Sequence, residues 1–77
     1  MKEEKTLGVN ALKISLAAAR VNAGMTQGEV AKALHVSNKT VVNWENGKVD
    51  TPFIALEALA RLYGMPMEFF RLPKESA

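Results

Sequence analysis

Apolar residues recur at helical spacing along most of the chain, and the clearest pattern lies between residues 26 and 47. Two short apolar sets flank a polar turn there: Val30, Ala31 and Leu34, then Val41 and Trp44. Within each set the spacing places the side chains on one face of a helix. Helices this short bury little surface alone, so we expect the rest of the chain to pack around them.

Polar residues mark where the first of these helices begins. Thr26 and Glu29 have the spacing of a capping box, in which each side chain accepts a hydrogen bond from the other residue's backbone N–H. Met25 and Val30 occupy the two positions of a hydrophobic staple around that cap. The helix is therefore predicted to begin near Gln27.

A second set of signals separates the two helices. Ser37 is a predicted N-cap, so the first helix is expected to end at Leu34, with residues 35–36 as the turn. The second helix is predicted over about 38–46, and Gly47 ends it as a C′ glycine. Two helices joined by so short a turn have the form of a helix-turn-helix, whose second helix enters the DNA major groove.

The exposed face of the second helix distinguishes this interpretation from two helices that merely pack together. It carries amides, a hydroxyl and a lysine but no acidic residue: Asn38, Lys39, Thr40, Val42, Asn43 and Asn46. A solvated face with no other role more often mixes Glu and Lys. Amides pair with adenine edges and Lys with guanine, so the composition favours DNA binding.

The spaced residues T-Q-x-E-V-A-x-x-L-x-V-S-x-x-T-V-x-x-W-E-N-G-K resemble the phage-repressor and Cro-like (XRE-like) helix-turn-helix family. The resemblance extends from about Arg20 to Phe70. It implies an all-α fold, a compact five-helix lambda-repressor-like domain with the helix-turn-helix as helices 2 and 3. His35 stands where the family has Gly, at a site that favours a positive φ, which His tolerates better than most residues.

The resemblance also implies which residues contact DNA. Those matching base-reading positions are Asn38, Lys39 and Asn43. Val42 lies between them and either touches a thymine methyl or is a plain exposed valine. The residues matching phosphate-contacting positions are Gln27, Thr40, Asn46 and Lys48. Gln27 opens its helix, where free N–H groups favour a phosphate. Gly28, the next residue, is unfavourable in a helix. It is either tolerated there or marks a point where the backbone approaches a phosphate.

In the resembled family an Arg on the first helix pairs with the Glu that follows the aromatic residue of the recognition helix. The matching residues are Arg20 and Glu45, which we expect to form a structural strut; the alternative is a solvated Arg20. The first helix itself is predicted over residues 10–22, with Asn10 as its cap and Gly24 as its stop. Its expected core stripe is Leu12, Leu16, Ala19 and Ala23.

Beyond Gly47, two further helices are predicted. Thr51 is the expected cap of a fourth helix with Pro52 at its first position, and Gly64 ends it. Its two apolar flanks are formed by Ile54, Leu56, Leu59, Leu62 and Tyr63. A last short helix is expected over residues 67–72, burying Met67 and Phe70.

The adjacent Phe69 and Phe70 cannot easily be buried together. An exposed Phe69 with Leu72 would form a dimer patch, and the family often dimerises through this region. The alternative is that Phe69 packs over the first helix. The predicted organisation is a flexible N-terminal segment at 1–9, one helix-turn-helix domain at 10–72 and a disordered tail at 73–77.

Composition bounds the remaining possibilities. A chain of 77 residues, 48% hydrophobic, is expected to form one domain with a modest core. Cysteine is absent and His35 is the single histidine, so no metal site is expected. There is no nucleophile elbow or glycine-rich phosphate loop, so neither an enzyme nor a cofactor is predicted. With no signal peptide and no apolar run of membrane-spanning length, we expect a cytoplasmic protein.

Two functions are consistent with these features. The first is a sequence-specific double-stranded DNA-binding transcriptional regulator, a small repressor of prophage-like type that acts as a homodimer. It would be controlled by its own concentration, by proteolysis or by a regulatory protein partner. The formal charge of +2 and pI near 9.2 are compatible with it but only mildly basic. The second is a protein-interaction module, such as an antitoxin or adaptor, that uses the apolar patch at Phe69 and Leu72. The acid-free face of the second helix favours the first.

Overall fold

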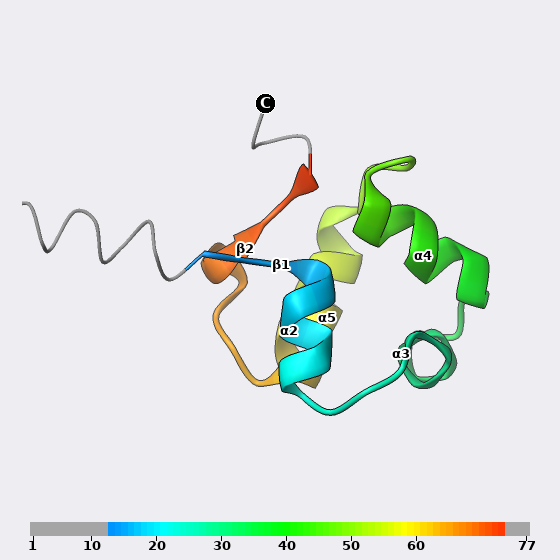
Figure 1. Ribbon diagram of the computed structural model, residues 1–77, viewed down its shortest axis with the longest axis horizontal. Coiled ribbons are helices and arrows are strands. Elements are labelled where there is room, and N and C mark those ends of the chain that lie inside the picture. The colour runs from blue at the N-terminus through cyan, green and yellow to red at the C-terminus, as the bar shows by residue number, and fades with distance from the viewer. Residues whose placement is uncertain (1–12, 74–77) are drawn as a thin grey trace, which may run out of the picture.

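The computed structural model describes residues 13–73, which form a helical bundle with a two-stranded sheet at one end (Figure 1). Four α-helices lie in this part of the chain: α2 (Leu16–Asn22), α3 (Gln27–Leu34), α4 (Asn38–Asn46) and α5 (Phe53–Tyr63). A 3-10 helix, η1 (Met67–Phe69), follows α5. The sheet consists of β1 (Ile14–Ser15) and β2 (Phe70–Arg71).

The predicted capping box at the start of α3 is present. The Glu29 backbone N–H donates to Thr26 Oγ1 at 3.1 Å, and the Thr26 N–H donates to Glu29 Oε1 at 2.8 Å. At the other end of α3, His35 has φ 60° and ψ 43°, which is the left-handed conformation expected where the family has glycine. These local signals confirm both bounds of α3.

The second helix of the pair also begins and ends as predicted. Ser37 Oγ accepts a hydrogen bond from the Thr40 backbone N–H at 3.1 Å, so Ser37 is the N-cap of α4. Gly47 ends the helix with φ 81°. The Lys48 N–H then donates to the Asn43 carbonyl at 3.0 Å, as in a glycine-terminated helix.

The first helix begins later than predicted, because the described residues before Leu16 are not helical. α2 begins at Leu16, and Ser15 is its N-cap, accepting from the Ala18 N–H at 3.0 Å. The predicted cap Asn10 and core residue Leu12 lie outside the described residues. Ile14 and Ser15 are extended instead because they pair with β2 in parallel register, Ile14 with Phe70 and Ser15 with Arg71.

The C-terminal part of the fold also differs from the prediction. α5 begins at Phe53 with Pro52 as N-cap, so Thr51 is not the cap and Pro52 precedes the first helical position. The last predicted helix, 67–72, is replaced by η1 and β2. The bundle is therefore mostly helical rather than all-α, because long-range pairing of Phe70 and Arg71 with β1 overrides the helical pattern.

Side chains from the four α-helices and from β2 build the core. The buried set comprises Leu16, Ala19, Val30, Ala31, Val41, Trp44, Ala55, Leu59, Ala60 and Phe70. It includes Val30, Ala31, Val41 and Trp44, as the helix-turn-helix pattern predicted. Ala23, expected in the core stripe, is exposed because α2 has already ended.

The exposure of apolar side chains in the C-terminal half bears on two predictions. Ile54, expected on a packed flank of α5, is 75% exposed, because Ala55, Leu59 and Ala60 are the residues that α5 buries. Phe69 and Leu72, predicted to form a dimer patch unless Phe69 packed over the first helix, are both half-buried, and Leu72 packs against the core. The strand β2 turns this segment toward the bundle instead of presenting it to solvent.

Candidate nucleic-acid interface

The exposed side of α4 carries the residues predicted to read bases. Asn38 and Lys39, in its first turn, are exposed, whereas Val42 and Asn43 are half-buried. Val41 and Trp44 on the opposite side are buried in the core. The core contacts thus fix which side of α4 faces solvent, and that side has no acidic residue.

The amino ends of α3 and α4 lie side by side. A Cβ added to Gly28, in the first turn of α3, would lie 3.6 Å from Asn38 Oδ1 in the first turn of α4. Gly28 and Asn38, which come from different helices of the motif, are therefore neighbours in space. Ala would fit at position 28 at ordinary contact distance.

A hydrogen-bonded ion pair joins α2 to α4, as the family resemblance implied. Arg20 Nε lies 2.8 Å from Glu45 Oε2, and the two side chains are only 15% and 8% exposed. Arg20 Nη1 also donates to the Met25 carbonyl at 3.0 Å. Gln27 Nε2 donates to Glu45 Oε1 at 3.0 Å, which brings α3 into the same network. One carboxylate therefore fixes three helices relative to one another.

Two pKa values depend on this network, that of Arg20 itself and that of Tyr63. The hydrogen bond from Arg20 to Glu45 raises the pKa of the guanidinium, against the smaller opposing effect of burial. Burial, assisted by the Glu45 charge, raises the pKa of Tyr63 to about 12. Both groups keep their ordinary protonation state near neutral pH, so Arg20 is charged and Tyr63 is neutral.

The other predicted phosphate-contacting residues lie at the two ends of α4. Thr40 Oγ1 is 2.8 Å from Ser37 Oγ, so its hydroxyl belongs to the N-terminal cap. Asn46 Oδ1 accepts from the Lys48 backbone N–H at 3.0 Å, which orders the residues just after the helix. Gln27 is held by Glu45 at the start of α3. Their positions form a border around the exposed face of α4.

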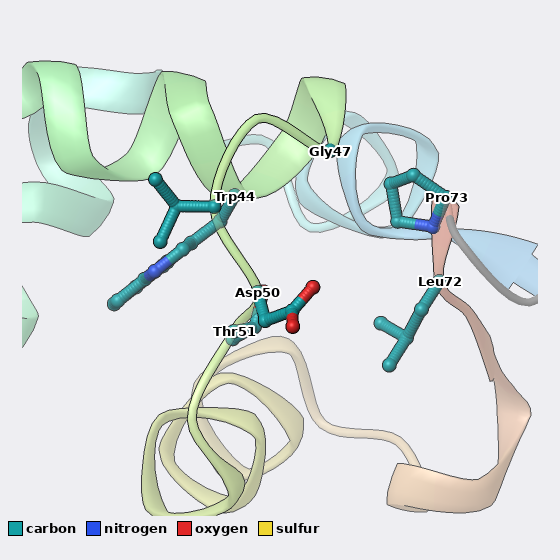
Figure 2. A pocket seen from close by; sticks show the side chains of 7 residues that line it. Trp44, Gly47, Asp50, Thr51, Leu72 and Pro73 are labelled. Atoms are coloured by element: carbon teal, nitrogen blue, oxygen red, sulfur yellow. The ribbon is translucent and has the colours of Figure 1, made fainter.

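One contact at the carboxyl end of α4 was not predicted from the sequence. Pro73, assigned to the disordered tail, packs against Gly47, where an added Cβ would lie 2.8 Å from Pro73 Cβ. Figure 2 shows Pro73 beside Gly47, with Leu72 and Trp44 on opposite sides of a hollow. The volume of this hollow is about 100 Å³. The segment after β2 thus supports the carboxyl end of the helix.

Residues 13–73 hold neither a metal site nor a membrane-spanning helix. No group of three or more His, Asp or Glu side chains there could hold a metal ion. No helix in the same range is long and apolar enough to cross a membrane.

Comparison with known proteins places this arrangement in a family. The model of the helix-turn-helix family, of XRE-like type, matches residues 16–70, which is well over half of the chain. The match spans all four described helices, including α3 and α4 at its centre. Comparisons with curated proteins and with solved structures gave no significant match. The chain belongs to the XRE-like helix-turn-helix family, a family of DNA-binding regulatory proteins.

Proposed function

We propose that this protein is a sequence-specific double-stranded DNA-binding regulator of transcription, with α4 as the helix that enters the major groove. The observation that carries the proposal is the exposed face of α4, which bears amides and a lysine without any acid. The Arg20–Glu45 pair supports it, because the pair holds α4 against α2 while leaving that face open. A rigid helix with a hydrogen-bonding face is what base readout needs.

Within this proposal, the position of a residue on or beside α4 determines whether it contacts bases or phosphates. Asn38, Lys39 and Asn43 read base edges, and Val42 adds an apolar contact to a thymine methyl. Residues on the border contact phosphates and set the docking position: Gln27, Thr40, Asn46 and Lys48. At α3, the free backbone N–H groups beside Gln27 and the bare surface at Gly28 allow a phosphate to approach the helix end.

We further propose that the protein acts as a repressor and binds as a homodimer. Dimers of helix-turn-helix proteins read two half-sites about 34–36 Å apart, which raises affinity and specificity together. A bound dimer would block polymerase at a promoter. Control would then come from protein concentration, proteolysis or a regulatory protein partner.

The alternative, an antitoxin or adaptor acting through Phe69 and Leu72, has less support. Both side chains are half-buried, and Leu72 packs on the core and lines the hollow beneath α4. The side chains that form this segment therefore support the fold more than they offer a docking surface.

Two alanine variants test the division of roles. Asn43→Ala is expected to weaken binding to the preferred sequence by about 1–3 kcal/mol and to relax base preference at one position. Lys48→Ala is expected to weaken binding to all sequences alike and to reduce the salt dependence of log K by about one unit. Fluorescence anisotropy with matched duplexes at several salt concentrations measures both effects. A change of base preference in Lys48→Ala, with none in Asn43→Ala, would refute the assignment.

A further inference from the structure

An apolar surface remains uncovered on the outer side of α5. Phe53 and Ile54 at its start are 64% and 75% exposed. Two adjoining shallow hollows, of about 300 and 460 Å³, lie beside them and share Leu34 and Ala58 as lining residues. Arg61 is the one charged residue that lines either hollow. No other segment between residues 13 and 73 covers this surface.

The outer face of α5 has a symmetrical arrangement of side chains. Ile54 and Leu62 each lie four residues from Ala58, so all three share one side of the helix. Ile54 is exposed, whereas Ala58 and Leu62 are half-buried, and Leu62 also packs against the core. A second α5 packed antiparallel, with a two-fold axis through Ala58, would place Ile54 against Leu62 of the second copy, twice. The small side chain at the centre allows the two backbones to approach closely.

The charges on this face are complementary in the same antiparallel arrangement. Glu57 and Arg61 are exposed, one turn apart, and neither has an ion-pair partner in the described part of the chain. Antiparallel pairing brings Glu57 of one copy toward Arg61 of the other, on both sides of the axis. Parallel pairing would place like charges together, which is unfavourable.

We propose that the outer face of α5, comprising Phe53, Ile54, Glu57, Ala58, Arg61 and Leu62, binds a second copy of this chain in antiparallel, two-fold symmetric contact. This inference rests on the proposed function, because the expectation of a dimer comes from it. It assigns the dimer surface to α5 in place of Phe69 and Leu72. An interface of this kind is self-complementary, because every contact from one residue to another of the second copy is repeated in the opposite direction, and only Ala58, on the axis, meets its own counterpart.

Sedimentation equilibrium of the full chain without DNA, from low to high micromolar concentration, tests the proposal. The unmodified chain is expected to show a monomer–dimer equilibrium. Ala58→Glu, which places a charge on the two-fold axis, is expected to raise the dimer dissociation constant on the order of 100-fold. Val21→Glu is the matched control: Val21 is also exposed, at 64%, but lies on α2, and the dissociation constant should not change.

Charge reversal provides a second test at positions where folding is not at risk. Glu57→Arg and Arg61→Glu, each alone, are expected to weaken the dimer about tenfold, because each creates like-charge contacts across the axis. The double variant restores opposite charges and should recover the original dissociation constant. Far-UV circular dichroism checks that every variant is folded.

The outcomes separate this inference from the proposed function. A chain that stays monomeric, or a dimer that neither Ala58→Glu nor the charge reversals affect, would overturn the α5 interface. If such a chain still selects a specific DNA sequence, the proposed function stands. A dimer that the α5 variants dissociate but that selects no sequence would overturn the function and leave the interface in place.

Discussion

Glu45→Ala is expected to destabilise the fold by about 3–5 kcal/mol, which is a large part of the total stability of a small domain. Glu45 is 8% exposed and accepts hydrogen bonds from Arg20 and Gln27, so its removal leaves a guanidinium, itself only 15% exposed, without its counter-charge. Leaving a buried charge unpaired costs far more than the net contribution of an intact pair. Urea-induced unfolding followed by far-UV circular dichroism measures the loss.

Two controls make this result specific to the strut. Glu68→Ala removes an exposed carboxylate from η1 and should change stability by less than about 0.5 kcal/mol. Replacing both partners, Arg20→Met with Glu45→Leu, should recover most of the loss because no unpaired charge remains. A Glu45→Ala variant with an unchanged unfolding midpoint would show that Arg20 is effectively solvated and that the strut contributes nothing.

Gly47→Ala is expected to destabilise the protein by roughly 2–4 kcal/mol. Part of the cost comes from φ 81°, a left-handed conformation that disfavours any Cβ. The rest comes from Pro73, whose Cβ would lie 2.8 Å from the new methyl group. The proline ring cannot rotate away, so either the segment after β2 or the end of α4 must move.

Gly64→Ala is the matched control for this variant. Gly64 has φ 71° at the end of α5, but a Cβ there would meet nothing within 4 Å, so only the conformational cost of about 1–2 kcal/mol applies. With Pro73→Gly as the reference, adding Gly47→Ala should cost no more than Gly64→Ala does, because the proline ring is no longer there to clash with the new methyl group. Equal destabilisation by Gly47→Ala and Gly64→Ala would mean that Pro73 does not support the end of α4.

The helix-turn-helix could be predicted because its signals are local. The bonds between Thr26 and Glu29, the cap at Ser37 and the stop at Gly47 each join residues a few positions apart. The left-handed conformation at His35 followed from its place in the motif. The Arg20–Glu45 pair, 25 residues apart in sequence, was predicted only through the family resemblance, because spacing alone did not exclude a solvated Arg20.

The parts that could not be predicted depend on contacts between the two ends of the domain. Ile14 and Phe70 have helical neighbours in sequence, yet they pair as parallel strands. Because of that pairing, α2 begins later than predicted, and η1 and β2 stand in place of the last predicted helix. Leu72 packs against the core. The pairing also brought Pro73 against Gly47. Such long-range pairing leaves no periodic signal when each strand has only two residues.

The most direct test of the central claim is selection of bound fragments from a random duplex pool at near-physiological salt, followed by sequencing. The proposed function predicts enrichment of an inverted repeat with half-sites about one helical turn apart. A variant with Asn38, Lys39 and Asn43 changed to Ala should lose that enrichment while remaining folded. A pool that stays unenriched with the unmodified chain, leaving only weak, salt-sensitive binding, would contradict sequence-specific readout by α4.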